Sequence, residues 1–201
     1  MRARDVRDPR VLEAIGRVPR HLFVPEALRA NAHEDRPLSI GFGQTISQPY
    51  IVAFMTQALD VDPAHRVLEI GTGCGYQTAV LAELAREVFT IEIVPELAAR
   101  AARMLADQGY ANVHVRAGDG YAGWPDEAPF DRILAAAAPA DVPPALEEQL
   151  AEDGVLVLPV GGWHQEIRVV QKRHGRLQSR DVLPVRFVPM VRRDDGRGGG
   201  R

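Results

Sequence analysis

The stretch Val67–Tyr76, with the sequence VLEIGTGCGY, decides the fold of this chain. Its first four residues, Val67–Ile70, form a short apolar run typical of a buried strand, and glycine then occupies every second position from Gly71 to Gly75. Glycines let the backbone turn sharply and approach a ligand closely, and a helix that starts after such a turn presents free N–H groups. Apolar residues continue at helical spacing through Ala79–Ala85. The stretch therefore predicts a strand, a ligand-binding turn and a helix in succession.

The same alternation continues along the chain. Further strands are predicted at Val88–Ile93, Val113–Val115, Phe130–Ala135 and Val155–Val160, with helices at Pro95–Gln108 and Pro143–Glu152. Strands that alternate with helices are joined by right-handed crossovers and form a parallel sheet. The last two predicted strands, Ile167–Gln171 and Val182–Val188, are joined by a polar turn instead of a helix. We expect an α/β fold of the Rossmann-like type, with a doubly wound, mostly parallel sheet and an antiparallel C-terminal hairpin.

Residues 1–64 are predicted to form a helical cover with a substrate loop. Their elements are helices at Asp8–Arg17 and Pro49–Leu59, a helical turn at Glu26–Asn31, and a loop at Pro37–Pro49 rich in glycine, proline and hydroxyl groups. A chain of 201 residues is long enough for one substantial core and short for two, so the cover and residues 65–191 should form one compact domain. Residues 192–201 consist of glycine and charge, and we expect them to be disordered.

Composition and charge argue against several classes of function. The net charge of −3 disfavours sequence-independent binding to nucleic acid, which needs a basic surface. No apolar run approaches the roughly 20 residues that cross a bilayer. Cys74 is the single cysteine, so no intrachain disulfide can form, and the histidines lack the spacing of metal ligands. We expect a cytoplasmic monomer that binds no metal, membrane or nucleic acid.

The glycine turn and three acids predict a cofactor site. The turn reads G-x-G-x-G after an acid, Glu69, and differs from the G-x-G-x-x-G of dinucleotide sites, so it fits a ligand without a pyrophosphate, such as S-adenosylmethionine. Glu92 follows the first glycine by about 20 residues, where an acid accepts from ribose hydroxyls, and Asp119 could accept from the adenine amine. The alternative is a structural glycine turn with incidental acids. The predicted cofactor residues are Glu69, Gly71, Thr72, Gly73, Gly75, Glu92, Asp119 and Gly120.

Four stretches of the chain resemble one family of enzymes. They are VPR at Val18–Arg20 with Phe23 and Val24; GQTISQPY at Gly43–Tyr50; VLEIGTGCGYQT at Val67–Thr78; and LPVG at Leu158–Gly161 with RFVP at Arg186–Pro189. The chain resembles the protein-L-isoaspartate (D-aspartate) O-methyltransferases, and the resemblance extends from about Asp8 to Val191. It implies a class I S-adenosylmethionine methyltransferase that esterifies the free carboxylate of isoaspartyl residues in damaged proteins. The ester then closes to a succinimide, and hydrolysis of the ring returns part of the material to aspartate.

The resemblance also assigns the site beside the cofactor. It makes Ser47 the catalytic residue and Gln44, Thr45 and Ile46 the substrate-binding residues. From spacing alone, Ser47 is more often an N-cap of the helix that begins at Pro49, and the two roles are compatible. A carboxylate is already ionised at neutral pH and the sulfonium methyl group is already activated, so the reaction needs alignment and exclusion of water more than a general base.

Two departures from the family leave other functions open. The chain lacks an additional N-terminal helix of family members, which predicts a thinner substrate cover, and Ala135–Ala138 stands where members often carry a Thr-Ala-Ala segment. These departures motivate a first alternative, a carboxyl methyltransferase of the same lineage dedicated to one biosynthetic peptide or small molecule. A non-catalytic cofactor-binding module is a second, and a nucleic-acid methyltransferase, disfavoured by the charge, is a third.

Overall fold

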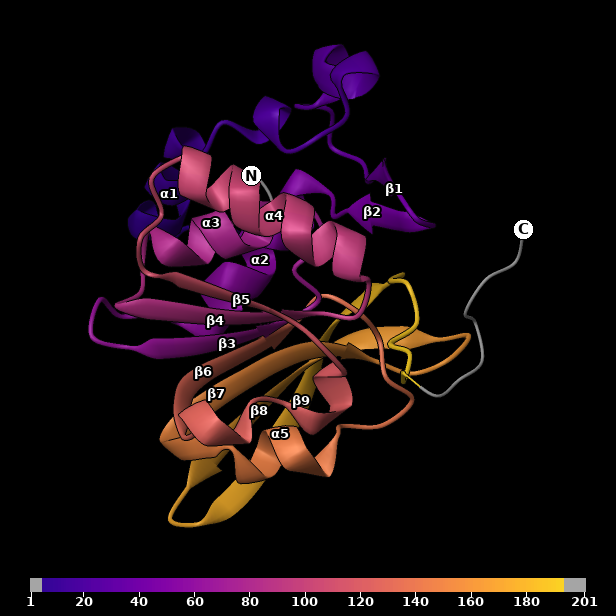
Figure 1. Cartoon of the computed structure of the whole chain (residues 1–201). Helices are drawn as coiled ribbons and strands as arrows, with labels where there is room; N and C mark the ends of the chain where they lie inside the picture. The colour runs from indigo at the N-terminus through magenta and orange to yellow at the C-terminus, as the bar shows by residue number, and fades with distance from the viewer. Residues whose placement is uncertain (1–4, 194–201) are drawn as a thin grey trace.

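A seven-stranded sheet forms the centre of the computed structural model, which describes residues 5–193 (Figure 1). The strands lie in the order β5-β4-β3-β6-β7-β8-β9, and β3 to β7 run parallel while β8 and β9 are antiparallel. The predicted α/β fold, with its mostly parallel sheet and antiparallel C-terminal hairpin, is confirmed. The strand bounds are β3 Arg66–Ile70, β4 Glu87–Glu92, β5 Val113–Ala117, β6 Phe130–Ala135, β7 Leu150–Val160, β8 Gln165–Arg173 and β9 Arg176–Val185.

Helices cover both faces of this sheet. Figure 1 shows α1 to α4 on one side of it and α5 on the other. The α-helices are α1 Pro9–Arg17, α2 Pro49–Leu59, α3 Tyr76–Ala82, α4 Pro95–Asp107 and α5 Pro144–Glu148. Short 3₁₀ helices lie at η2 Arg20–Leu22, η3 Glu26–Asn31, η4 Gly120–Ala122 and η5 Pro125–Glu127. Among the described residues, none of these helices combines the length and apolar character that a membrane span requires.

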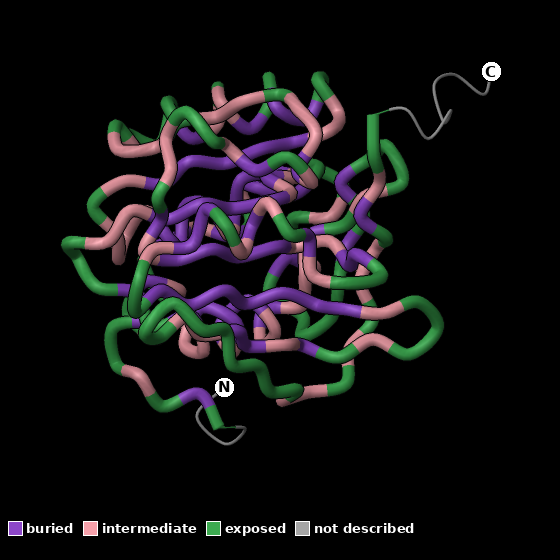
Figure 2. The backbone as a smooth tube through the Cα atoms, turned by 90° about the horizontal axis from the view of Figure 1, so that it is seen from below, coloured by how far each residue is buried: buried purple, intermediate pink, exposed green. Residues whose placement is uncertain are grey.

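The central strands β3, β4 and β6 are buried on both faces, which explains their largely apolar sequences, whereas the outer strands β5 and β9 are mostly partly buried or exposed. Side chains alternate along a strand, so Val67 packs with Leu59 of α2 while the next residue, Leu68, packs with Leu146 of α5. Figure 2 shows the buried backbone concentrated in the middle of the molecule, with exposed segments around it. A third hydrophobic cluster joins Phe23 of the first 64 residues to Leu97 of α4. The division into a cover and a core stays a prediction, but the two parts share this cluster.

Two expectations about local structure were wrong. The predicted loop Pro37–Pro49 contains a hairpin of β1 (Leu38–Gly41) and β2 (Gln44–Ile46). The two residues of its turn, Phe42 and Gly43, have positive φ angles, as does Gly41 at the end of β1. The predicted helix Pro143–Glu152 ends at Glu148, because Leu150 pairs with Phe130 and begins β7. Both differences arise where pairing with another strand takes precedence over local pattern.

Other bounds agree closely with expectation. The helix predicted at Pro49–Leu59 and the strand predicted at Phe130–Ala135 have those bounds in the structure. The last strand is an exception, because it was predicted at Val182–Val188 and runs from Arg176 to Val185. The chain then crosses to lie beside Ala138, which forms an isolated bridge with Pro189. The disorder predicted for residues 192–201 concerns a tail of which all but Arg192 and Arg193 lies outside the described residues.

Candidate active site

The glycine turn after β3 forms the floor of a cavity at the carboxyl ends of the parallel strands. The Gly71 N–H donates to the carbonyl of Ile91 at 2.8 Å, which ties the turn to β4. Gly73 and Gly75 have positive φ angles of 55° and 90°. A Cβ atom at Gly75 would lie 3.2 Å from Leu105 of α4, so a side chain there would be both strained and crowded. The turn therefore needs glycine for its conformation and for its close packing.

Glu92 stands at the end of β4 and lines this cavity. Its carboxylate is buried, with 4% of the residue exposed, and one oxygen accepts from the Gly73 N–H at 2.7 Å while the other accepts from the Val94 N–H at 3.0 Å. Each carboxylate oxygen has two lone pairs, so both keep the capacity to accept from a ligand hydroxyl. The position and orientation suit a pair of ribose hydroxyls, the role that the sequence predicts for Glu92.

Glu69 lies behind the cavity wall instead of in it. Its side chain is fully buried and accepts hydrogen bonds from the hydroxyls of Thr78 at 2.5 Å and Thr90 at 2.7 Å. The Thr90 hydroxyl in turn lies 2.7 Å from that of Thr72 in the glycine turn. Burial raises the pKa of Glu69 to about 7. Only Oε2 takes part in this network beneath the turn, whereas Oε1 is buried without a hydrogen-bond partner among the described residues. Glu69 does not line the cavity, and its predicted contact with the cofactor ammonium stays a prediction.

The third predicted acid, Asp119, shapes the turn after β5. Its side chain caps η4 by accepting from the Tyr121 N–H at 2.8 Å. The following residue, Gly120, lines the cavity, and a Cβ atom there would lie 2.2 Å from the side chain of Ile70. Gly120 therefore allows the turn after β5 to pack directly against Ile70, where a side chain would not fit. Asp119, Glu69 and Gly75 lie outside the cavity lining, whereas Gly71, Thr72, Gly73, Glu92 and Gly120 belong to it.

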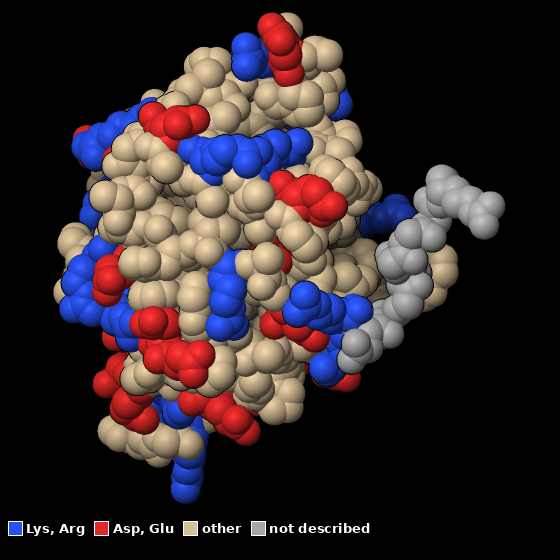
Figure 3. Space-filling view, viewed as in Figure 1, with Lys and Arg blue, Asp and Glu red and all other residues tan. Residues whose placement is uncertain are grey.

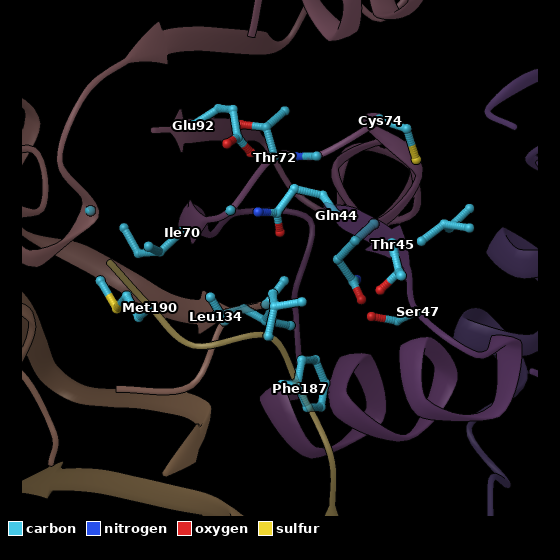
Figure 4. Close-up of a pocket in the computed structure, with 18 of the residues that line it drawn as sticks. Gln44, Thr45, Ser47, Ile70, Thr72, Cys74, Glu92, Leu134, Phe187 and Met190 are labelled. Atoms are coloured by element: carbon cyan, nitrogen blue, oxygen red, sulfur yellow. Dashed lines mark hydrogen bonds between the residues drawn. The ribbon is translucent and has the colours of Figure 1, made fainter. Parts of the chain in front are cut away.

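The β2 strand and Ser47 form the other end of the cavity. Gln44, Thr45, Ile46 and Ser47 all contribute to the lining. In Figure 4, the hydroxyl groups of Thr45 and Ser47 lie close to each other at one end of the cavity, and Glu92 and Thr72 lie at the opposite end. The N-cap of α2 is Gln48, without a side-chain capping bond, so Ser47 does not take the capping position that its spacing suggested. Its hydroxyl is free of that role.

The C-terminal segment closes the cavity and was missed as part of the site. Phe187, Val188 and Met190 belong to the lining. The segment is held against Ala138, whose N–H donates to the Val188 carbonyl at 2.9 Å and whose carbonyl accepts from the Met190 N–H at 2.8 Å. The RFVP motif at Arg186–Pro189 could have indicated that this segment belongs to the site, but the sequence alone did not show where in the fold it lies. Ala136 also lines the cavity. The run Ala135–Ala138, which lacks the hydroxyl of a Thr-Ala-Ala segment, therefore contributes apolar surface to the cavity wall.

A second cavity opens beside the first and shares its Ser47 end. Both cavities are lined by Thr45, Ser47, Ile51, Ala136, Phe187 and Val188. The second cavity extends past Pro37 and Gln48 on one side and Pro184 and Arg186 on the other. A ligand at Ser47 can therefore be approached from the surface through a route separate from the glycine turn.

Comparison with known proteins agrees with this geometry. Residues 1–195 match the family model described as protein-L-isoaspartate(D-aspartate) O-methyltransferase. A protein-L-isoaspartate O-methyltransferase of Opitutus terrae is 57% identical over 192 residues, which is 94% of this chain and 82% of that protein. One from Anaeromyxobacter dehalogenans strain 2CP-1 is 59% identical over 190 residues, covering 92% of this chain and 91% of that protein.

Solved structures with the same description share the fold. One protein-L-isoaspartate O-methyltransferase superposes with a TM-score of 0.86 at 28% identity, over 96% of this chain and 64% of that chain. A structure from Plasmodium falciparum, in complex with S-adenosyl-L-homocysteine, has a TM-score of 0.83 over 94% of each chain, and at 23% identity it supports the fold alone. Together with the family model, the close relatives decide the assignment. This chain belongs to the protein-L-isoaspartate(D-aspartate) O-methyltransferase family.

Proposed function

We propose that this chain transfers a methyl group from S-adenosylmethionine to the free carboxylate of L-isoaspartyl and D-aspartyl residues in damaged proteins, which initiates repair through a succinimide. The observation that carries the proposal is one continuous cavity with two different ends. Glu92 and the glycine turn form a nucleoside-binding end, and Thr45 and Ser47 form a hydroxyl-lined end (Figure 4). A methyl donor bound at the first end can present its methyl group to an acceptor at the second.

The lining fits the proposed cofactor. Glu92 would accept from the two ribose hydroxyls with the lone pairs that Gly73 and Val94 leave unused. Ile70 and Ile91 provide apolar surface for a nucleoside, and Gly120, which packs closely against Ile70, lines the same cavity. We propose Asp119 as acceptor for the adenine amine, and Gly71, Thr72 and Gly73 as the turn that receives the amino-acid end. For Glu69 and Gly75 we propose an indirect part, as support of that turn.

The chain's own residues would orient the acceptor and exclude water. When bound, S-adenosylmethionine supplies an activated methyl group on a sulfonium. Ser47 would donate a hydrogen bond to one carboxylate oxygen, with Gln44, Thr45 and Ile46 beside it, so that the other oxygen faces the methyl carbon. The C–O bond forms as the C–S bond breaks, and no proton needs to move. Alignment at about 3 to 3.5 Å and a dry site can supply most of the acceleration in such a transfer.

The apolar walls around Ser47 support this mechanism. Ala136 and Phe187 stand beside the hydroxyl-lined end and belong to both cavities. Apolar surface excludes water from the reacting atoms, which strengthens the hydrogen bond from Ser47 to a charged oxygen. The second cavity supports a polypeptide acceptor, because it gives the chain on either side of the acceptor residue a path to the surface.

We further propose a cytoplasmic monomer that binds neither nucleic acid nor membrane. Cys74 is buried and unpaired, which is compatible with a reducing compartment. On the face shown in Figure 3, basic and acidic side chains are interspersed instead of forming the basic patch that nucleic-acid binding needs. Size-exclusion chromatography with light scattering tests the monomer, and a species of twice the mass of 22.1 kDa would contradict it.

Transfer of labelled methyl groups tests the proposed reaction. The protein is incubated with methyl-labelled S-adenosylmethionine and either an isoaspartyl peptide or its aspartyl twin of the same sequence. We expect label in the isoaspartyl peptide alone, as a base-labile ester. Equal labelling of both peptides, or labelling of a small carboxylic acid and neither peptide, would contradict the proposal and favour a dedicated carboxyl methyltransferase. Cofactor binding without transfer to any carboxylate would favour a binding module.

A further inference from the structure

Two exposed apolar side chains lie on turns that adjoin segments of the cavity wall. Among the described residues, the large hydrophobic side chains with substantial exposure are those of Phe42, Trp163 and Leu177, at 57%, 98% and 41%. Phe42 is at the tip of the β1–β2 hairpin, and Trp163 is in the turn between β7 and β8. Figure 1 shows the hairpin and that turn at the same end of the molecule, the end where the parallel strands terminate. Leu177 follows the β8–β9 turn, at the opposite end of β8 from Trp163.

The turn that carries Trp163 has a defined conformation. Gly161 has a φ angle of +123°, and a Cβ atom there would lie 2.1 Å from the carbonyl oxygen of His164. The Gly161 N–H donates to the carbonyl of Pro139 at 3.0 Å, which fixes the start of the turn against the chain that leaves β6. Trp163 is thus held in solvent by a turn that only glycine permits. A fully exposed tryptophan loses the free energy that burial of its large apolar surface would provide.

The hairpin tip holds Phe42 in a conformation that is unfavourable for an aromatic residue. Its φ angle is +55°, between the positive φ angles of Gly41 and Gly43. Bulky residues rarely adopt positive φ, where glycine or asparagine is common. The hairpin is attached to the body of the protein by a hydrogen bond of 2.7 Å from the Arg100 guanidinium to the Ile40 carbonyl. Backbone strain and exposure of an apolar ring are both costs at one position, and such costs are typical of functional sites.

Each of these residues is connected by a short segment of chain to the cavity wall, although neither lines a cavity itself. Phe42 precedes Gln44, which lines the first cavity, by two positions, and Thr45, which lines both cavities, by three. Trp163 precedes Gln165 by two positions. The side-chain amide of Gln165 accepts from the Phe187 N–H at 2.6 Å and donates to the Phe187 carbonyl at 3.2 Å. Two residues span at most about 7 Å. Phe42 and Trp163 therefore stand near the two sides of the cavity, one on the hairpin side and one on the side of the C-terminal segment.

We propose that Phe42 and Trp163 bind apolar side chains that flank the isoaspartyl residue in the substrate polypeptide, so that the enzyme prefers damaged sites with apolar neighbours. This inference rests on the proposed function. A short extended peptide fits the two contacts better than a second copy of the chain does. Each aromatic ring offers about 150 to 250 Å², whereas a stable protein interface buries about 800 Å² on each partner. A peptide anchored at Ser47 needs only such local contacts beside the anchor.

Kinetics with paired peptides test the inference. One isoaspartyl peptide carries leucine and phenylalanine beside the isoaspartyl residue, and its twin carries serine at those positions. The variants are Trp163→Ser and Phe42→Asn, since asparagine tolerates positive φ, with Leu177→Ser as the matched control at the opposite end of β8. We expect each of the first two variants to lower kcat/KM for the apolar peptide by about 3- to 10-fold through KM, with less than about 2-fold change for the serine peptide. Leu177→Ser should change neither value.

Tryptophan fluorescence gives an independent readout. Binding of the apolar peptide to the wild-type protein with S-adenosylhomocysteine should shift the emission to shorter wavelength, and Trp163→Ser should abolish the shift. Equal kinetic effects on both peptides, equal effects of Leu177→Ser, or no effect of either variant would overturn the inference and leave the proposed function standing. A dimer in the wild type that Trp163→Ser dissociates would also overturn it. Failure of the wild type to methylate any isoaspartyl peptide would overturn both.

Discussion

The Glu92 carboxylate and the Gly73 backbone N–H are joined by a hydrogen bond of 2.7 Å. This bond connects the end of β4 to the middle of the glycine turn, so the residue proposed to hold the ribose also sets the shape of the turn proposed to hold the amino-acid end. Loss of the carboxylate should therefore affect both parts of the cofactor site.

We expect Glu92→Ala to weaken binding of S-adenosylhomocysteine by about 1 to 3 kcal/mol, because buried hydroxyls and N–H groups would lose their acceptor. Isothermal titration calorimetry measures the change. Glu87→Ala is the matched control, since Glu87 lies at the other end of the same strand and interacts with Arg66 and His114. If Glu92→Ala bound the ligand as tightly as Glu87→Ala, Glu92 would have no place in the cofactor site.

Ser47→Ala should lower turnover on an isoaspartyl peptide by about 10- to 100-fold, the range expected for a hydrogen bond to a charged group. Affinity for S-adenosylhomocysteine should stay nearly constant, since Ser47 lies at the opposite end of the cavity from Glu92 (Figure 4). Ser39→Ala, an exposed serine on β1, serves as the control. Loss of cofactor binding in Ser47→Ala would show that Ser47 acts on the cofactor or on the fold instead of on the acceptor.

Glu69 should make stability depend on pH. Burial raises the pKa of its carboxyl to about 7 in the folded protein, above the ordinary value of 4.5. The folded state therefore retains a proton that the unfolded state loses, and this residue's contribution should fall as pH rises from about 4.5 through about 7. The change should reach roughly 3 kcal/mol, at 1.36 kcal/mol per unit of pKa. Urea unfolding of the wild type and Glu69→Gln at pH 5 and pH 8 measures it. Parallel pH dependence in the two proteins would contradict the buried, protonated state.

Gly120→Ala should destabilise the protein by about 1 to 3 kcal/mol, because the new Cβ atom would lie 2.2 Å from Ile70 and the neighbours must move. Gly16→Ala in α1 is the control, since nothing lies within 4 Å of the Cβ position there. That substitution should stabilise the helix by about 0.5 to 1 kcal/mol. Thermal or urea unfolding compares the two variants. A neutral Gly120→Ala would show that the turn after β5 has room to move.

The sequence predicts elements well where local signals and tertiary structure agree. Proline at the first helical position and apolar spacing define the start and end of α2, and the apolar run of β6 has no competing pattern. The helix predicted to end at Glu152 is shorter in the structure because Leu150 pairs with Phe130. Phe130 lies 20 positions earlier, so the residues around Leu150 give no local indication of this pairing. The sequence did not predict the β1–β2 hairpin, because its strands are short and its turn contains Phe42, a type of residue that rarely has a positive φ angle.

The site was predictable in its positions and less so in its contacts. Strand ends at a shared edge are sufficient to bring Glu92 and the glycine turn together. They do not decide whether the side chain of Glu69 faces the cavity, because that depends on the hydroxyls of Thr78 and Thr90, which come from two other elements. The part played by Phe187 depends on a crossing of the C-terminal segment after β9, for which no periodicity exists.

The most direct measurement is a crystal structure of the protein with S-adenosylhomocysteine and an isoaspartyl peptide. We expect ribose hydroxyls on Glu92, the sulfur atom between the glycine turn and β2, and the isoaspartyl carboxylate within hydrogen-bond distance of the Ser47 hydroxyl. A nucleoside bound elsewhere, or an isoaspartyl carboxylate remote from Ser47 with its oxygen out of line with the sulfur, would contradict this arrangement.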